Sequence, residues 1–145
     1  MKSPAACLFA CLLVLCAAPA FAAPQPLLAS AAWLRATPGT DVAAVYLTLH
    51  NTGSEPVTVV AVRSPLAQDA MIHESQLSGT QSSMRPRAQL SVGPGQTVRF
   101  APGGLHVMLH GLAHALRPGD EVPLVLLLAD GATLSVSAHV RPLQE

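Results

Sequence analysis

Most of this chain lacks cysteine. Its three cysteines, Cys7, Cys11 and Cys16, all lie near the N-terminus. If that segment is removed, the remainder can form no disulfide, no cysteine-ligated zinc site, no blue-copper centre and no thiolate nucleophile. Aromatic residues make up only 3% of the 145 residues, and the net charge is zero without a basic cluster. The composition therefore offers neither a stacking platform nor a cationic surface for nucleic acid.

The first 22 residues have the parts of a secretory signal peptide. A lysine follows the initial methionine, the chain is apolar over 5–18, and small residues precede a cleavage site after Ala22. We expect export to the periplasm and, because the apolar run is short, no stable membrane insertion. A lipoprotein signal is the alternative, which the bulky Leu15 before Cys16 and the early position of Cys11 disfavour.

The rest of the chain has the pattern of one all-β domain. Short β-prone runs are separated by turn residues, which is typical of a sandwich or a barrel. We expect a signal peptide over 1–22, a loose leader over 23–30, one domain over 31–142 and a polar loop over 78–83. The expected strands cover 31–36, 42–50, 57–62, 69–76, 89–92, 97–100, 105–112, 122–128 and 133–140.

Two histidines and two methionines form the pattern H-x10-M-x21-H-x-M, at His73, Met84, His106 and Met108. Thioether sulfur favours Cu(I), and imidazole also binds it. His106 and Met108 are two apart on an expected strand, so their side chains share a face about 6.6 Å apart. Met84 follows the polar loop and could close the site. The pattern predicts a Cu(I) site, although such residues taken singly are more often surface or core residues.

This motif resembles that of the periplasmic PCu(A)C copper chaperones in residue identity and spacing. The segments around Trp33, Tyr46 and 102–109 are also similar to that family. The resemblance implies a cupredoxin-like Greek-key β-sandwich and a Cu(I) carrier, not an enzyme. It further implies delivery to the CuA centre of cytochrome c oxidase, with a Sco-family protein as a possible second partner. We expect a monomer. Copper storage, electron transfer and a non-metal interaction module are the alternatives.

The chain departs from the family pattern in three places. Glu74 stands where some members have a methionine, and 140–145 is not the His/Met-rich tail that holds Cu(II) in some members. Met71 could be an additional ligand near His73, although core packing is favoured. His110 shares the expected face of the strand, but its distance of roughly 13 Å from the first histidine of that strand argues against ligation.

Several other residues have two interpretations each. Glu74 could orient His73 or be solvated. Arg85 and Arg87 could guide docking to an acidic partner or lie on a solvated loop. Trp33 could be a core or rim aromatic, or could shield the ion. The remaining histidines are expected at the surface or in turns: His50, His114 and His139.

Overall fold

The computed structural model describes residues 25–36, 38–78 and 81–143. Within these ranges the chain is one all-β domain without a helix, so the predicted fold class is confirmed, and no helix there could cross a membrane. The predicted signal peptide over 1–22 lies outside the described residues. The strands are β1 Leu27–Arg35, β2 Val42–Asn51, β3 Val57–Arg63, β4 Ala67–Ser78, β5 Gln81–Arg87, β6 Leu90–Val92, β7 Thr97–Arg99, β8 Leu105–Leu112, β9 Glu121–Leu128 and β10 Thr133–Arg141.

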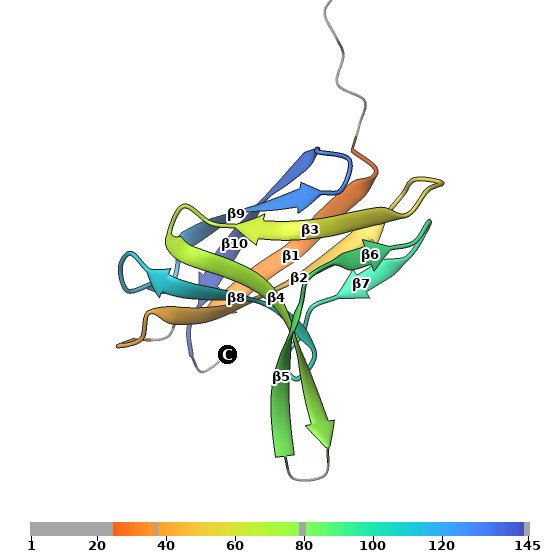
Figure 1. Ribbon diagram of the computed structural model, residues 1–145. Coiled ribbons are helices and arrows are strands. Elements are labelled where there is room, and N and C mark those ends of the chain that lie inside the picture. The colour runs from red at the N-terminus through yellow and green to blue at the C-terminus, as the bar shows by residue number, and fades with distance from the viewer. Residues whose placement is uncertain (1–24, 37, 79–80, 144–145) are drawn as a thin grey trace, which may run out of the picture.

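The strands join into one strongly curled sheet. Its order is β5-β4-β8-β2-β1-β10-β9-β3-β6, and β7 also pairs with β2. The pairing of β1 with β10 is parallel, and the other pairings are antiparallel. The curl brings β3 beside β4, although they are distant in the pairing order (Figure 1). The sheet is therefore a nearly closed, barrel-like body around one core.

Alternation along the strands decides which face carries the core. In β2, the side chains of Val45, Leu47 and Leu49 are almost completely buried, whereas Tyr46 between them faces outward and is half-buried. Burial of each such apolar side chain contributes about 1.5–3 kcal/mol relative to its exposure. A shift of one residue in the pairing register of β2 would expose all of these apolar side chains. Burial of the core therefore determines which residues of β2, and of the strands beside it, face outward.

β1 begins at Leu27, so the prediction of a loose leader over 23–30 is wrong from that residue onward. Leu27 is fully buried. A β-bulge follows Ser30, and Ala31 has a positive φ of 50°. The extra residue of a bulge breaks the period of two, which hides the first half of the strand from a pattern analysis. The bulge also places Trp33 on the outward face.

β5 occupies part of the segment predicted as a polar loop over 78–83. The hairpin of β4 and β5 extends past the rest of the sheet as a twisted arm (Figure 1). β5 is an edge strand in the sheet order, and an edge tolerates Pro86, which lacks a backbone N–H. Polar residues and a proline masked this strand in the sequence. Met84 consequently lies within a strand instead of after a loop.

Candidate metal site

His73 and His106 face each other across adjacent strands. The antiparallel pairing of β4 with β8 places His73 opposite His106 and Met71 opposite Met108. Directly opposed residues carry their side chains on the same face of a sheet. The two imidazole centroids are 5.8 Å apart, and the rings are nearly perpendicular at 86°. The fold thus brings His73, His106 and Met108 together on one outward face.

Met84 approaches this face from the other edge of β4. It pairs with Ser75, which is two residues from His73 and therefore shares its face. Met84 and Met108 are both diagonal neighbours of His73, a separation that long side chains can bridge. The Met84 side chain is 58% exposed. All four motif residues therefore lie on one face of three adjacent strands, with Met84 on the solvent side.

The ring of His106 is held in one orientation. Its side chain is only 4% exposed, and Nδ1 lies 3.1 Å from the backbone oxygen of Gly104. A carbonyl oxygen only accepts hydrogen bonds, so this contact assigns the proton to Nδ1. The Nε2 lone pair is then left for a metal ion, in the arrangement by which an outer hydrogen bond fixes a ligating histidine.

His73 has a ring nitrogen without a hydrogen bond. Its Nδ1 is buried and finds no partner among the described residues. Burial lowers the pKa of His73 below 6.5, the nearby rings of His106 and His110 lower it further, and Asp69 opposes them. The neutral ring is therefore favoured, and a neutral imidazole is the form that binds metals.

The donor set around these histidines selects the kind of ion. Within the described residues, no group of three or more histidine, aspartate and glutamate side chains is placed to hold a metal. A site built on His73 and His106 would therefore need the sulfur atoms of Met84 and Met108. Two imidazoles and two thioethers make a soft set that fits Cu(I) better than harder ions.

An aromatic row continues the outward face beyond His106. The ring of Tyr46 lies 6.5 Å from that of His106, and Trp33 lies 4.7 Å from Tyr46. The guanidinium groups of Arg35 and Arg141 lie 5.4 and 4.7 Å from the Trp33 centroid. Trp33 is thus a rim aromatic, and Tyr46 lies between it and His106. The alternation of β2 predicts an outward Tyr46, but only the pairing of β2 with β8 brings it to His106.

His110 is another residue whose position the sequence did not predict. Its ring centroid lies 6.3 Å from that of His73, which is on the neighbouring strand β4. Along β8, His110 is four residues from His106, with Met108 between them on the same face. Asp69 is directly opposite His110 on β4. Spacing along β8 gives only the distance between His110 and His106. The approach to His73 arises across strands and could not be read from that spacing.

Glu74 and the two arginines of β5 do not face the histidines. Consecutive residues of a strand alternate in direction, so Glu74 lies on the face opposite to His73. Its carboxylate instead accepts a hydrogen bond from Arg87 Nε at 2.9 Å. Arg85 and Arg87 alternate with Met84 in the same way. The interpretation of Glu74 as the partner of His73 is therefore wrong, and docking through the arginines stays a prediction.

The other histidines lie at the surface, as predicted. His50 Nδ1 is 2.9 Å from Thr97 Oγ1, and the side chain of His114 is exposed. His139 Nδ1 is 2.9 Å from Glu121 Oε1. Hydrogen bonds from Ser137 and His139 hold the pKa of the Glu121 carboxyl below its usual range. One nitrogen of each of the His50 and His139 rings therefore has a partner within the protein.

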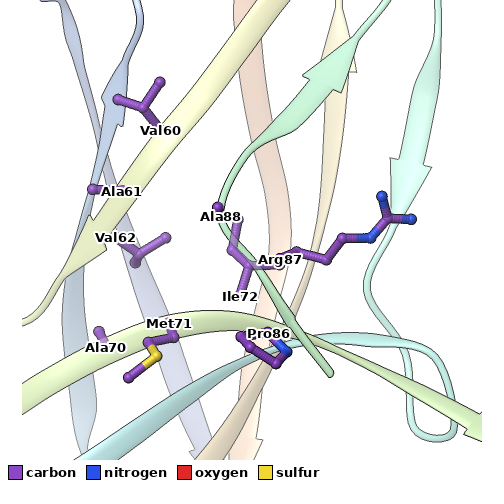
Figure 2. Close-up of a pocket in the computed structure, with 9 residues that line it drawn as sticks. All are labelled: Val60, Ala61, Val62, Ala70, Met71, Ile72, Pro86, Arg87 and Ala88. Carbon is purple, nitrogen blue, oxygen red and sulfur yellow. The ribbon is translucent and has the colours of Figure 1, made fainter. Parts of the chain in front are cut away.

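An apolar cavity of about 350 Å³ lies between β3 and β4 and is also lined by Pro86 and Arg87 of β5. Figure 2 shows Val60, Val62 and Met71 among the side chains around it. Met71 is 41% exposed, so its interpretation as a core residue is wrong. Its position opposite Met108 leaves the interpretation as an additional ligand open.

Known proteins resemble this chain in sequence. A family model described as "Putative lipoprotein LpqE-like" matches residues 27–140. A protein of Leifsonia xyli subsp. xyli (strain CTCB07), named "Putative lipoprotein Lxx21020", is 32% identical over 113 residues. That match covers 77% of this chain and 68% of the Leifsonia protein.

Solved structures give the same result at the level of the fold. The solution structure of CuI-DR1885 from Deinococcus radiodurans is 33% identical with a TM-score of 0.63, covering 79% of this chain and 77% of that one. The apo PmoF2 PCuAC domain is 21% identical with a TM-score of 0.69, covering 85% and 95%. At 21% identity, the match to the PmoF2 domain is evidence about the fold alone. The resemblance to PCu(A)C proteins that the sequence predicts is confirmed.

Proposed function

The chain belongs to the LpqE-like family, and from this premise we propose that it is an exported Cu(I)-binding chaperone. The observation that carries the proposal is the register of β4 with β8, which sets His73 opposite His106 and beside Met108. The similarity to CuI-DR1885 supports copper as the metal and Cu(I) as its state. Copper is the cargo of such a protein, bound and then released.

We assign the four motif residues different parts in binding. His106 is the fixed ligand, because Gly104 orients its ring. His73 lies centrally, opposite His106 and diagonal to both methionines, and supplies a neutral imidazole. Met108 adds sulfur from the rigid β8. Met84 is the most exposed of the four and stands on the projecting arm, so it is the ligand that a partner would replace first.

The destination of the copper is the finer part of the proposal. We propose that the protein works in the periplasm and passes Cu(I) to the CuA centre of cytochrome c oxidase, directly or through a Sco-family protein. The lipoprotein names of the family and of the Leifsonia relative support export. Ligand-by-ligand exchange requires an accessible site, and the exposed thioether of Met84 provides it.

Electron transfer at the same site is the second candidate function. It would require copper to cycle between Cu(I) and Cu(II) with the same ligands, and two thioethers disfavour Cu(II). Voltammetry distinguishes the two functions. An electron-transfer protein would show fast, reversible cycling of its copper between Cu(I) and Cu(II), whereas a Cu(I) chaperone would not. A non-metal interaction module, the third candidate, would bind no copper tightly.

A Cu(I) titration tests the proposal. We would titrate the mature protein anaerobically against a chromogenic Cu(I) chelator, beside Met84→Ala, His106→Ala and the exposed control His114→Ala. Because loss of even an outer-shell partner costs a metal site about 10- to 100-fold in affinity, we expect at least that loss for His106→Ala. Met84→Ala should weaken binding by about tenfold, and the control should match the wild type.

The stoichiometry and the variants decide the outcome. One Cu(I) per chain, weakened in both ligand variants, would support the four-residue site. Absence of competitive binding, or binding indifferent to both substitutions, would reject the proposed function.

A further inference from the structure

Met71 lies beside the histidines, on the same outward face of the sheet. It is two residues from His73 along β4, and the register of β4 with β8 sets it directly opposite Met108. Alternate residues of a strand share a face. The burial agrees, since Met71 is 41% exposed whereas Ile72, the next residue, is 5% exposed and belongs to the core. Met71 therefore points out of the barrel on the side of His73.

β4 and β8 carry the same pattern in opposite directions. β4 contains Met71-x-His73 and β8 contains His106-x-Met108, and the antiparallel pairing sets histidine opposite histidine and methionine opposite methionine. Opposed residues have Cβ atoms about 4.5–5.5 Å apart, and residues two apart on a strand are separated by about 6.6 Å. Two imidazoles and two thioethers thus surround one small area of the face. This is the soft donor set that suits Cu(I).

By register, Met71 has more of the proposed ligands as neighbours than Met84 has. Its neighbours are His73 along β4, Met108 directly opposite and His106 on the diagonal. Met84 has only His73 as such a neighbour, because β4 separates its strand from β8. A diagonal neighbour is about 7–8 Å away, which a long side chain can bridge. The pairing of β4 with β8 therefore places a third thioether at the site.

Met71 also has space to change its conformation. It lines the cavity of about 350 Å³ between β3 and β4, together with Val60 and Val62 (Figure 2). A methionine side chain is unbranched and rotates about several bonds, so it adapts readily to different surroundings. Its thioether can therefore lie against the apolar wall of the cavity in one state and turn toward the histidines in another.

We infer that Met71 is a reserve ligand, which binds Cu(I) through its thioether when Met84 leaves the ion. The other ligands, His73, His106 and Met108, stay in place. The inference rests on the proposed function, in which an acceptor replaces Met84 first. In the exchange, the bond between copper and the Met84 sulfur breaks and a bond to the Met71 sulfur forms. Both thioethers are neutral, so no proton or electron moves and copper stays Cu(I).

A double-mutant cycle with leucine tests the inference, with Cu(I) as the probe. Leucine has nearly the volume of methionine and no donor atom, so Met71→Leu and Met84→Leu remove sulfur while conserving packing. We expect Met71→Leu alone to stay within about twofold of the wild-type Cu(I) affinity and Met84→Leu to lose about tenfold. The double variant should lose at least about tenfold more, because no reserve thioether is left. Val60→Ala added to Met84→Leu changes the cavity wall without removing a donor, and should match Met84→Leu.

X-ray absorption at the copper edge counts the sulfur neighbours of the ion in the same samples. We expect as many in Met84→Leu as in the wild type, and one fewer in the double variant. The count for Met84→Leu tests the inference without any change at Met71. Chemical denaturation of the metal-free double variant, beside metal-free Met84→Leu, shows that its loss of affinity is not a loss of folding.

The possible results separate this inference from the proposed function. Fewer sulfur neighbours in Met84→Leu than in the wild type, or a double variant that binds as tightly as Met84→Leu, would overturn the reserve ligand while leaving the Cu(I) site in place. Equal losses from Met71→Leu with and without Met84 would also overturn it, since Met71 would then be a permanent ligand. Failure of the wild type to bind Cu(I) would instead reject the proposed function. Preserved sulfur in Met84→Leu, with a loss from Met71→Leu in that background alone, would support the inference.

Discussion

At the scale of single residues, the lowered pKa of His73 leads to predictions about how the protein and its proposed metal site respond to pH. Burial lowers its pKa below 6.5, and the rings of His106 and His110 act in the same direction. Between the folded and the unfolded pKa, the unfolded chain binds more protons at this position. The free energy of unfolding of the metal-free protein should therefore decrease as the pH falls from 6.5 toward the folded pKa.

The same histidine predicts the pH dependence of Cu(I) affinity. Metal binding needs neutral imidazoles, so affinity should be constant near neutral pH and should decrease in acid. The decrease should reach at most about tenfold per pH unit for each histidine that must lose a proton. Chelator competition at a series of pH values measures it, and NMR titration of the His73 ring locates the midpoint below 6.5. An affinity that stays flat into strong acid would contradict histidine ligation.

At the scale of elements, the end of β8 depends on a glycine. Gly111 directly follows His110 and has a φ of +64°, a region that residues with a Cβ rarely adopt. A Cβ built there would approach the side chain of Gln68 to 2.8 Å. Gly119 also has a positive φ, of +95°, but a Cβ there meets nothing within 4 Å. The two glycines therefore separate backbone strain from steric collision.

Alanine at each glycine should have different costs. Gly119→Ala should lower the free energy of unfolding by about 1–2 kcal/mol through backbone strain alone. Gly111→Ala should lower it further, because overpacking adds about 1–3 kcal/mol. Chemical denaturation measures both differences. Equal costs for the two variants would show that Gln68 moves aside freely.

At the scale of the whole molecule, the barrel and the arm have different parts in the proposed delivery of copper. The core holds β4 and β8 in register, whereas Met84 lies on β5, a strand of the arm that extends past the rest of the sheet (Figure 1). An acceptor can therefore reach one ligand while the others still hold the ion. This arrangement predicts transfer through direct contact between the two proteins, without free Cu(I) as an intermediate.

Transfer to an isolated apo CuA domain tests that prediction. We expect the rate of Cu(I) transfer to increase with acceptor concentration and to exceed the rate of release to a chelator. Direct contact makes the rate depend on encounters, whereas dissociation does not. Stopped-flow absorbance follows the transfer, and His114→Ala should behave as the wild type. Tight binding without transfer would refute delivery to CuA and leave storage as the function.

Sequence alone determined the all-β class, most of the strands and the identity of the four candidate ligands. Local alternation is sufficient for these, because the side-chain period of a strand is two and the buried face is apolar. The alternation of β2 and β8 places Tyr46, His106 and Met108 on outward faces. The bulge in β1 and the polar edge strand β5 escaped prediction because each breaks that period.

Only the tertiary structure decided which residues meet. The pairing of β4 with β8 sets His73 opposite His106, and the pairing of β4 with β5 makes Met84 its diagonal neighbour. The pairing of β4 with β8 also brings the ring centroid of His110 to 6.3 Å from that of His73. Spacing along β8 alone gives only the distance between His110 and His106. The physical reason is that register between strands is fixed by burial of the whole core and by the connecting turns. A spacing along the chain contains no information about those partners.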